Sequence, residues 1–235
     1  MKTIAVVLAA GSGSRMKSGT KKQFMMLGGF PLLYHSLKTF EESFIDGIVL
    51  VTGAEDIDFC REEIVDRYGF KKVSSIVPGG AERADSVLCG LRAAGECDYV
   101  FIHDGARPLL DEDILMRSYE AVKEYDAAVV GMPSKDTVKI ASADGFVEST
   151  PPRSLVWTIQ TPQVFRYSLI REAYESVLSR VEEYEKKGIR ITDDAMVLEA
   201  YSGHPVKLVE GSYRNIKVTT PEDIDVAERF LGERP

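Results

Sequence analysis

Short apolar runs alternate with longer amphipathic stretches along the first half of the chain. The runs are residues 4–8, 47–52, 99–103 and 127–132, and residues 73–77 are a further strand candidate. Continuous runs of five or six apolar residues are typical of strands buried on both faces, whereas apolar residues recurring every three or four positions are typical of helices. This alternation predicts an α/β fold with a mostly parallel sheet and helices on both faces.

The helices predicted between these strands follow from the same spacing. Pro31 suits the first turn of a helix, and Val87, Leu91 and Ala94 share one helical face. The predicted helices span residues 31–42, 54–68 and 111–124, and one contains residues 87–94. At 235 residues the whole chain is long enough to form one domain with its own core.

The pattern changes after residue 132. Residues 137–140 and 146–148 are short strand candidates joined by Ser-Ala-Asp-Gly, which places Gly145 at the turn of a hairpin. A hairpin of two strands is marginally stable alone in water. We therefore predict that residues 134–152 form a projecting β-hairpin arm that a second subunit covers.

The last third of the chain returns to strands and helices. Thr192 is predicted to start a helix with Asp193 and Asp194 in its first turn, and Thr220 is predicted to cap the last helix, with Asp223 near the free N–H groups. The other predicted elements are strands at residues 157–165, 206–209 and 216–218 and a helix at residues 167–185.

A glycine loop follows the first strand. Gly11 and Gly13 precede four cations, Arg15, Lys17, Lys21 and Lys22. The loop lacks G-x-x-x-x-G-K-[ST], and Met16 stands where a dinucleotide fingerprint needs its third small residue. What remains is a loop whose N–H groups can approach an anion while fixed cations surround it, as triphosphate binding requires. A plain strand-to-helix turn with solubilising lysines is the alternative.

Two further loops carry polar side chains at strand ends. Residues 78–87 follow the third strand, and residues 104–108 follow the fourth. Ligands of open α/β sheets bind beyond the carboxyl ends of the strands, so both loops are expected on the same edge as residues 9–22.

Composition excludes several classes of function. The net charge of −8 disfavours nonspecific nucleic-acid binding. Three cysteines without a C-x-x-C pair suggest reduced thiols, and three scattered histidines disfavour a histidine-built metal site. No apolar stretch is long enough to cross a membrane and no signal pattern is seen, so we expect a cytoplasmic protein without membrane partners.

Seven motifs occur in a specific order: LAAGSGSRM with KKQF, ERADSV, HDGARP, DTVK, TPQVF, ITDDA and VEGSYRNIKVTTPED. In this order the chain resembles the 2-C-methyl-D-erythritol 4-phosphate cytidylyltransferases of the non-mevalonate isoprenoid pathway. The resemblance implies a doubly wound, mostly parallel Rossmann-like sheet of the nucleotidyltransferase type, with residues 1–235 as one domain. It also implies an arm-exchanged homodimer, CTP and a polyol phosphate as substrates, and Mg²⁺ or another divalent cation.

The same resemblance assigns residues to roles. Arg15 and Lys22 resemble the pair that stabilises the transition state, and Arg153 and Lys217 resemble catalytic residues that position the sugar phosphate. Thr137 and Thr192 resemble further substrate contacts, and Asp104 resembles the metal-binding aspartate. The positions that match the nucleotide site are Ala9, Ala10, Gly11, Ser12, Gly13, Gly80, Ala81 and Ser86. Because Ala81 offers no polar side chain, recognition of the base would depend on backbone groups and Ser86.

In the implied reaction a phosphate monoester attacks the α-phosphorus of CTP. This nucleophile is already anionic, so no general base is needed, which fits the absence of a Ser-His-Asp or Cys-His pattern. Ribitol 5-phosphate cytidylyltransferase is the nearest alternative. A glycosyltransferase normally carries an Asp-x-Asp motif, and a non-catalytic nucleotide-binding module would be expected to lose Lys22 or Lys217.

Some of these residues also have a purely structural interpretation. Asp104 could cap the end of a strand, and Arg107 in the same loop is expected to tie the loop in place. Arg83 and Asp85 could pair with each other at the start of a helix.

Overall fold

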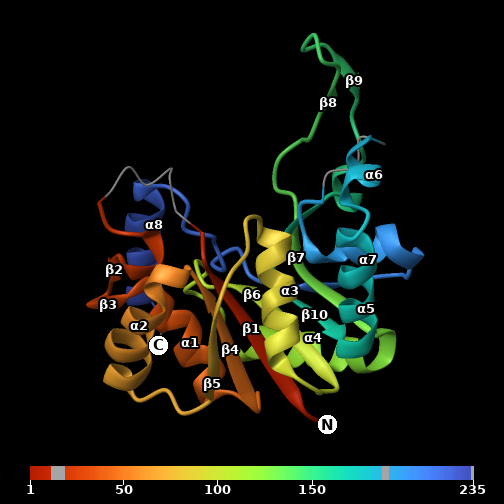
Figure 1. Ribbon diagram of the computed structural model, residues 1–235. Coiled ribbons are helices and arrows are strands. Elements are labelled where there is room, and N and C mark those ends of the chain that lie inside the picture. The colour runs from red at the N-terminus through yellow and green to blue at the C-terminus, as the bar shows by residue number, and fades with distance from the viewer. Residues whose placement is uncertain (12–18, 187–190, 234–235) are drawn as a thin grey trace.

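A seven-stranded sheet forms the centre of the computed structural model, which describes residues 1–11, 19–186 and 191–233 (Figure 1). The strand order is β11-β7-β10-β6-β1-β4-β5. The strands are β1 (Thr3–Ala9), β4 (Gly47–Thr52), β5 (Val73–Pro78), β6 (Tyr99–Asp104), β7 (Ala127–Pro133), β10 (Trp157–Arg166) and β11 (Lys207–Glu210). Within the described sheet only β10 is antiparallel to its neighbours, β6 and β7, which confirms the predicted α/β fold with a mostly parallel sheet.

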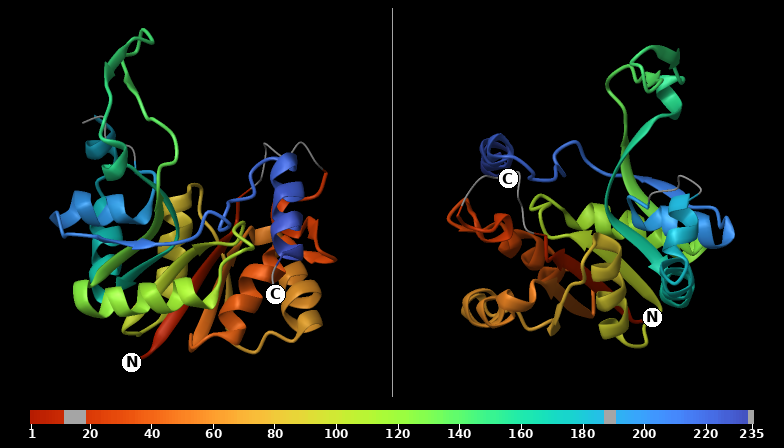
Figure 2. Two further views of the ribbon diagram at one scale, coloured as in Figure 1. Left: turned by 180° about the vertical axis from the view of Figure 1, so that it is seen from behind. Right: turned by 45° about the horizontal axis from the view of Figure 1, so that its top comes forward.

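Helices cover both faces of this sheet, as the buried apolar runs predicted (Figures 1 and 2). Alternate residues of β1 separate the two cores: Ala5 and Val7 face one side, and Ile4 and Val6 face the other. The first side is covered by α1 (Leu32–Glu42), the helical stretch η3, α2 and η4 (Ala54–Asp56, Ile57–Phe59 and Cys60–Asp66) and α4 (Glu112–Tyr125). The second side is covered by α3 (Arg83–Ala94), α5 (Tyr167–Leu178) and α7 (Asp194–Ser202).

A third, smaller core attaches the end of the chain to the beginning. Leu27 and Leu32 pack with Ala227 of α8 (Pro221–Gly232) and with Val218. Leu27 belongs to a two-residue strand, β2 (Met26–Leu27), that pairs with β3 (Phe30–Pro31). The sequence pattern did not reveal this hairpin, because two-residue strands leave no periodicity to detect. This core brings residues 216–219 to the edge of the sheet where the glycine loop begins.

At the starts of two helices, acidic side chains accept hydrogen bonds from free backbone N–H groups. Asp111 accepts a hydrogen bond from the Ile114 backbone N–H at 2.8 Å. At the start of α8, the Thr220 backbone N–H donates to Asp223 Oδ2 at 2.9 Å, within a reciprocal capping box. The predicted cap at Thr220 is therefore confirmed.

Several of the predicted elements differ from the observed ones. The strand predicted at residues 137–140 is observed only at Ile140–Ala141. Residues 216–218 do not form a strand: the Val218 N–H donates to the Ala106 carbonyl without joining the sheet. The helix predicted at residues 167–185 ends at Leu178, and α6 (Val181–Lys186) follows it. The helix assigned to Thr192 begins at Asp194, since Asp193 is its N-cap and accepts from the Met196 N–H. The helix predicted at residues 54–68 is not uniformly α-helical, because residues 60–66 follow the wider π pattern.

The predicted hairpin arm is present and projects from the body of the molecule (Figures 1 and 2). Its strands are β8 (Ile140–Ala141) and β9 (Val147–Ser149), and Gly145 at the turn has a φ of 84°, a conformation that favours glycine. Phe146 at the tip is 76% exposed. The arm therefore presents an apolar side chain that this chain alone does not cover.

The three cysteines are free thiols: Cys60 is buried, and Cys89 and Cys97 are half-buried. Among the residues described, no helix combines the length and apolar character needed to span a membrane.

Gly90 on α3 marks a close approach of a helix to the sheet. A Cβ atom there would lie 2.3 Å from Val6 Cγ1 and 2.9 Å from Val51 Cγ2. We expect Gly90→Ala to lower the free energy of unfolding by about 1–3 kcal/mol, because overpacking outweighs the better helix propensity of alanine. Urea denaturation measures this difference. Gly232→Ala, at an exposed helix end with nothing within 4 Å of the new Cβ, is the control and should change it by less than about 0.5 kcal/mol.

Candidate active site

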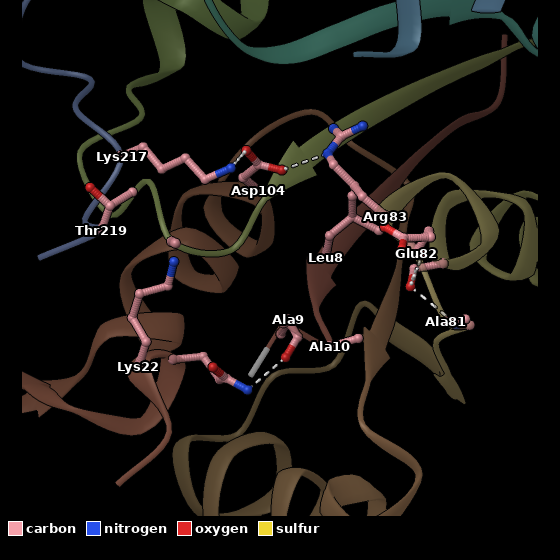
Figure 3. A pocket seen from close by; sticks show the side chains of 15 residues that line it. Leu8, Ala9, Ala10, Lys22, Ala81, Glu82, Arg83, Asp104, Lys217 and Thr219 are labelled. Carbon is pink, nitrogen blue, oxygen red and sulfur yellow. Dashed lines mark hydrogen bonds and ion pairs between the residues drawn. The ribbon is translucent and has the colours of Figure 1, made fainter. Parts of the chain in front are cut away.

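A cavity of about 500 Å³ lies at the carboxyl ends of β1 and β6 (Figure 3). The three loops that the sequence placed at this edge meet there, joined by residues 217 and 219 near the end of the chain. The lining residues are Leu8, Ala9, Ala10, Gly11, Lys22, Gln23, Gly80, Ala81, Glu82, Arg83, Ser86, Asp104, Ala106, Lys217 and Thr219. Nine of the residues singled out from the sequence thus share one cavity: Ala9, Ala10, Gly11, Lys22, Gly80, Ala81, Ser86, Asp104 and Lys217.

Ser12, Gly13 and Arg15 lie outside the described residues. Their expected roles in nucleotide binding and catalysis stay predictions.

The loop before α3 packs against the loop after β1. A Cβ atom on Gly79 would lie 2.6 Å from Ala10 Cβ, and one on Gly80 would lie 2.3 Å from Asp85 Cβ. Only glycine fits at these two positions without a local shift. The Gly80 N–H donates to Ser86 Oγ at 3.1 Å, and that hydroxyl donates to the Glu82 carbonyl. Ser86 therefore fixes the shape of this loop as well as lining the cavity.

The two adjacent lysines of the N-terminal loop have different surroundings. Lys22 lines the cavity, whereas Lys21 Nζ forms ion pairs with Glu55 and with Asp56 Oδ2, the latter at 2.6 Å. Next to them, Gln23 is buried and donates from Nε2 to the Ala9 carbonyl at 2.7 Å (Figure 3). This geometry favours Lys22 as the lysine that reaches a bound phosphate.

Asp104 is the central charge of the cavity. Its Oδ2 lies 2.7 Å from Lys217 Nζ and its Oδ1 lies 3.3 Å from Arg83 Nε, while its side chain is largely buried (Figure 3). Burial alone would raise the pKa of Asp104, but the charges of Arg83 and Lys217 outweigh it and hold that pKa well below its ordinary value. Asp104 is therefore an anion throughout the neutral range, and its carboxylate joins Arg83 to Lys217.

Arg83 joins this aspartate to a second, fully buried one. Asp194 is 0% exposed and receives hydrogen bonds from Arg83 Nη1 at 2.7 Å, from Arg83 Nη2 at 2.9 Å and from the Tyr174 hydroxyl at 2.5 Å. Burial lowers the pKa of Arg83, but the charges of Asp194 and Asp104 raise it well above its ordinary value. The alternative in which Arg83 pairs with Asp85 is wrong, because Asp85 instead accepts from the Glu82 N–H.

No local pattern in the sequence indicated this network. Arg83, Tyr174 and Asp194 are far apart along the chain, and a buried charge pair leaves no local periodicity. Asp193 and Asp194 stood out only as residues suited to a helix start, and Asp193 does serve as that cap.

The residues beneath Asp104 form a second polar network. The Asp104 N–H donates to Thr161 Oγ1, which lies 3.0 Å from His103 Nδ1, and His103 Nε2 lies 3.3 Å from the Arg107 carbonyl. Burial lowers the pKa of His103 from 6.5 to about 4, so the imidazole is neutral at neutral pH. A carbonyl only accepts, so Nε2 carries the single ring proton, and Thr161 then donates to Nδ1.

Arg107 ties this loop to neighbouring segments. Its Nη1 donates to the Asn215 carbonyl at 2.8 Å and its Nη2 to the Ile159 carbonyl at 3.4 Å. Asn215 in turn donates from Nδ2 to the Thr161 carbonyl. The expected loop-tying role of Arg107 is confirmed.

Three substrate-binding candidates do not line the cavity of this chain. Arg153 lies at the base of the arm, where Nη1 donates to the Lys135 carbonyl at 3.3 Å. The Thr192 hydroxyl lies 3.1 Å from Met196 Sδ, and Thr137 belongs to the irregular chain leading into the arm. The fold of one chain therefore does not bring Thr137, Arg153 and Thr192 to Lys22 and Lys217.

Among the described residues, two carboxylates line the cavity and could contribute to a divalent cation site, Asp104 and Glu82. No group of three or more His, Cys, Asp or Glu side chains that could hold a metal occurs among the residues described. Mg²⁺ commonly binds through one or two carboxylates together with substrate phosphates, so the ionised Asp104 at the wall of a cavity of about 500 Å³ fits that pattern.

Residues 3–233 match the family model described as "IspD: 2-C-methyl-D-erythritol 4-phosphate cytidylyltransferase". Two curated relatives carry this enzyme name. The protein of Lachnoclostridium phytofermentans is 50% identical over 232 residues, which cover 99% of this chain and 97% of that protein. The protein of Geobacter metallireducens is 49% identical over 239 residues, which cover 100% and 99%.

Solved structures agree on the fold. The crystal structure of 4-diphosphocytidyl-2C-methyl-D-erythritolsynthase from Anaerococcus prevotii DSM 20548 aligns with a TM-score of 0.83 and 34% identity, covering 99% of this chain and 96% of that chain. The 2-C-methyl-D-erythritol 4-phosphate cytidylyltransferase from Thermus thermophilus aligns with a TM-score of 0.74 and 29% identity, covering 99% and 100%. The predicted nucleotidyltransferase type of the sheet is confirmed.

Neutral His103 beneath the site predicts a pH dependence of stability. Its pKa is about 4 in the folded chain and 6.5 in the unfolded chain, so between these values only the unfolded chain takes up the proton. Stability therefore falls as the pH falls through this window, by up to about 3 kcal/mol. Urea denaturation of wild type and His103→Gln between pH 5 and 7 should show a shallower pH slope for the variant. Equal slopes would contradict a buried neutral imidazole.

Proposed function

The chain belongs to the 2-C-methyl-D-erythritol 4-phosphate cytidylyltransferase family, and from this we infer that it is a nucleotidyltransferase joining CTP to 2-C-methyl-D-erythritol 4-phosphate. The products are the CDP-methylerythritol compound and pyrophosphate, and the reaction belongs to non-mevalonate isoprenoid biosynthesis. One observation from the structure carries the inference: a cavity flanked by two glycine loops that also holds Lys22, Lys217 and Asp104.

The reaction transfers a cytidylyl group between phosphates. An oxygen of the methylerythritol phosphate attacks the α-phosphorus of CTP, the bond from that phosphorus to the bridging oxygen of the β-phosphate breaks, and pyrophosphate leaves with the electron pair. The nucleophile is an anion from the start, so no side chain needs to remove a proton. The obstacle is the repulsion between two anions, which makes positioning and charge compensation the main tasks of the site.

Lys22 and Arg15 are proposed to stabilise the charge that develops on the α-phosphate. Lys22 lines the cavity, which supports its part of this assignment, while the part of Arg15 is supported by the sequence motif alone. A lysine supplies a movable point charge, whereas an arginine supplies a planar fork of donors.

Lys217 and Asp104 are proposed to act at the acceptor side of the cavity. Their 2.7 Å ion pair holds the ammonium of Lys217 at the wall of the cavity, where it can meet the phosphate of the acceptor. Asp104, together with phosphates of CTP, would hold Mg²⁺, which offsets negative charge on the phosphates when bound.

The nucleotide base is proposed to bind against the loop of Gly80, Ala81 and Ser86, beside Ala9, Ala10 and Gly11. These residues present backbone groups and small side chains to the cavity. Ser86 already donates to the Glu82 carbonyl, so backbone N–H and C=O groups are expected to provide most of the contacts with cytosine.

The arm is proposed to complete the active site of a second subunit in a homodimer. Thr137 and Arg153 at its base lie outside the cavity lining of their own chain, and Phe146 at its tip is uncovered. Both observations are accounted for if a partner receives the arm. Thr192 is proposed to contact the acceptor as well. We expect the enzyme to work in the cytoplasm, where CTP is available.

Removing Lys22 or Arg15 tests the catalytic assignment. We expect Lys22→Ala and Arg15→Ala each to fold normally and to lose roughly 10²–10³-fold in turnover, the scale of removing one preorganised charge. A pyrophosphate-release assay with CTP, Mg²⁺ and 2-C-methyl-D-erythritol 4-phosphate measures this. Lys38→Ala, an exposed lysine on α1, is the control. Turnover at the wild-type level in either variant would refute its assignment.

The same assay tests the reaction itself when a panel of polyol phosphates is compared. Methylerythritol phosphate is expected to be the preferred acceptor over ribitol 5-phosphate. A preference for ribitol 5-phosphate would show that ribitol 5-phosphate is the acceptor. Binding of CTP without any release of pyrophosphate would indicate a nucleotide-binding module.

The oligomeric state tests the role of the arm. We expect a dimer by sedimentation at micromolar concentration, and we expect Phe146→Asp combined with Val147→Asp to shift it toward monomer, because charges replace two exposed apolar side chains. Loss of activity together with the dimer supports a shared site. A wild-type protein that sediments as a monomer contradicts the proposal.

A further inference from the structure

The side chains of the neighbouring residues Lys21 and Lys22 point in different directions. Lys21 has φ −59° and ψ 139°, a polyproline II conformation in which successive side chains are rotated by about 120° and so point in different directions. Lys22 lines the cavity, and Lys21 instead reaches Glu55 and Asp56 at the start of the helical stretch after β4. One lysine thus faces the proposed nucleotide site, and the other holds the loop to the body of the protein.

The residues around Lys22 are fastened at three points. Besides the ion pairs of Lys21, Gln23 donates to the Ala9 carbonyl, and the ring of Phe24 lies 4.7 Å from the ring of Phe59, centroid to centroid. The Phe24 N–H donates to the Lys21 carbonyl at 2.9 Å and closes the turn between them. The backbone on both sides of Lys22 is therefore tied to β1 and to α2.

We propose that Lys21, through its ion pairs with Asp56 and Glu55, is a positioning residue that holds the backbone of Lys22 so that its ammonium faces the nucleotide. The proposal rests on the proposed catalytic role of Lys22. A charge that is already in place when CTP arrives needs no reorganisation during the reaction, which is what makes fixed charges effective in catalysis.

Asp56 is the stronger of the two anchors. Its side chain is 13% exposed, whereas that of Glu55 is 70% exposed, so solvent and salt weaken the pair with Glu55 more. Hydrogen bonds from Lys21 to Asp56 and Glu55 raise the pKa of Lys21, which further favours its charged form. The ammonium of Lys21 also offsets one of the two negative charges of Asp56 and Glu55, which lowers their repulsion of a triphosphate bound next to Lys22.

The test compares Lys21→Met with wild type in the pyrophosphate-release assay. We expect kcat/KM for CTP to fall about two- to fivefold, the scale of a partly exposed ion pair, while the KM for the acceptor and the thermal midpoint stay at wild-type values. Lys38→Met, which removes another lysine paired with a glutamate, is the matched control and should leave kcat/KM unchanged.

Partner variants separate positioning from a general loss of charge. If the ion pair acts through Lys22, Asp56→Asn lowers kcat/KM for CTP, and adding it to Lys21→Met causes little further loss. Lys21→Arg keeps the ion pairs and should retain activity. Lys21→Pro fixes the observed φ without any charge and should recover part of the loss.

Two outcomes overturn the proposal. One is a Lys21→Met enzyme with wild-type kcat/KM for CTP, including the case in which only its thermal midpoint falls. The other is a pair of losses from Lys21→Met and Asp56→Asn that simply multiply in the double variant. Failure of the proposed function is a different result, because the wild-type enzyme itself would then release no pyrophosphate.

Discussion

The buried carboxylate of Asp104 is the interaction on which the geometry of the site depends. It sits at the end of a central strand, with Arg83 on one oxygen and Lys217 on the other. A buried charge is costly unless it is paired and hydrogen-bonded, so the packing of these three segments against each other lowers the cost of burying Asp104. The pairing that stabilises the interior at this point also fixes the two sides of the cavity relative to each other.

Several cations near the cavity are held by carboxylates. Arg83 is held by Asp194, Lys217 by Asp104 and Lys21 by Asp56. Such pairing keeps long side chains ordered in the absence of substrate, although it offsets part of their positive charge. A triphosphate brings its own negative charge and acceptor oxygens. The site is therefore suited to a reaction whose difficulty is anion repulsion and whose nucleophile needs no activation.

The arm differs from the sheet because its apolar side chains are not covered within one chain. The sheet buries its strands on both faces and is complete within one chain, whereas the hairpin carries exposed apolar side chains and leads away from the cavity. The family relationship accounts for the reaction, while the ion pair of Lys21 with Asp56 is read from the residues of this chain. The same loop therefore contains Lys22, which is proposed to act in the reaction of the family, and Lys21, whose ion pair with Asp56 is a feature of this structure.

The sequence by itself determined the seven strands of the central sheet, most of the helices and the edge of the sheet where the site forms. Burial on both faces and helix capping leave local patterns, such as residues 47–52 or Thr220 with Asp223. Its motifs also singled out Lys22, Asp104 and Lys217, which line one cavity in the structure. Only the tertiary structure decided that β10 inserts antiparallel between β6 and β7, that Arg83 selects Asp194 instead of Asp85, and that residues 216–218 stay outside the sheet. Those outcomes depend on contacts between distant segments, for which neighbouring residues carry no periodic signal.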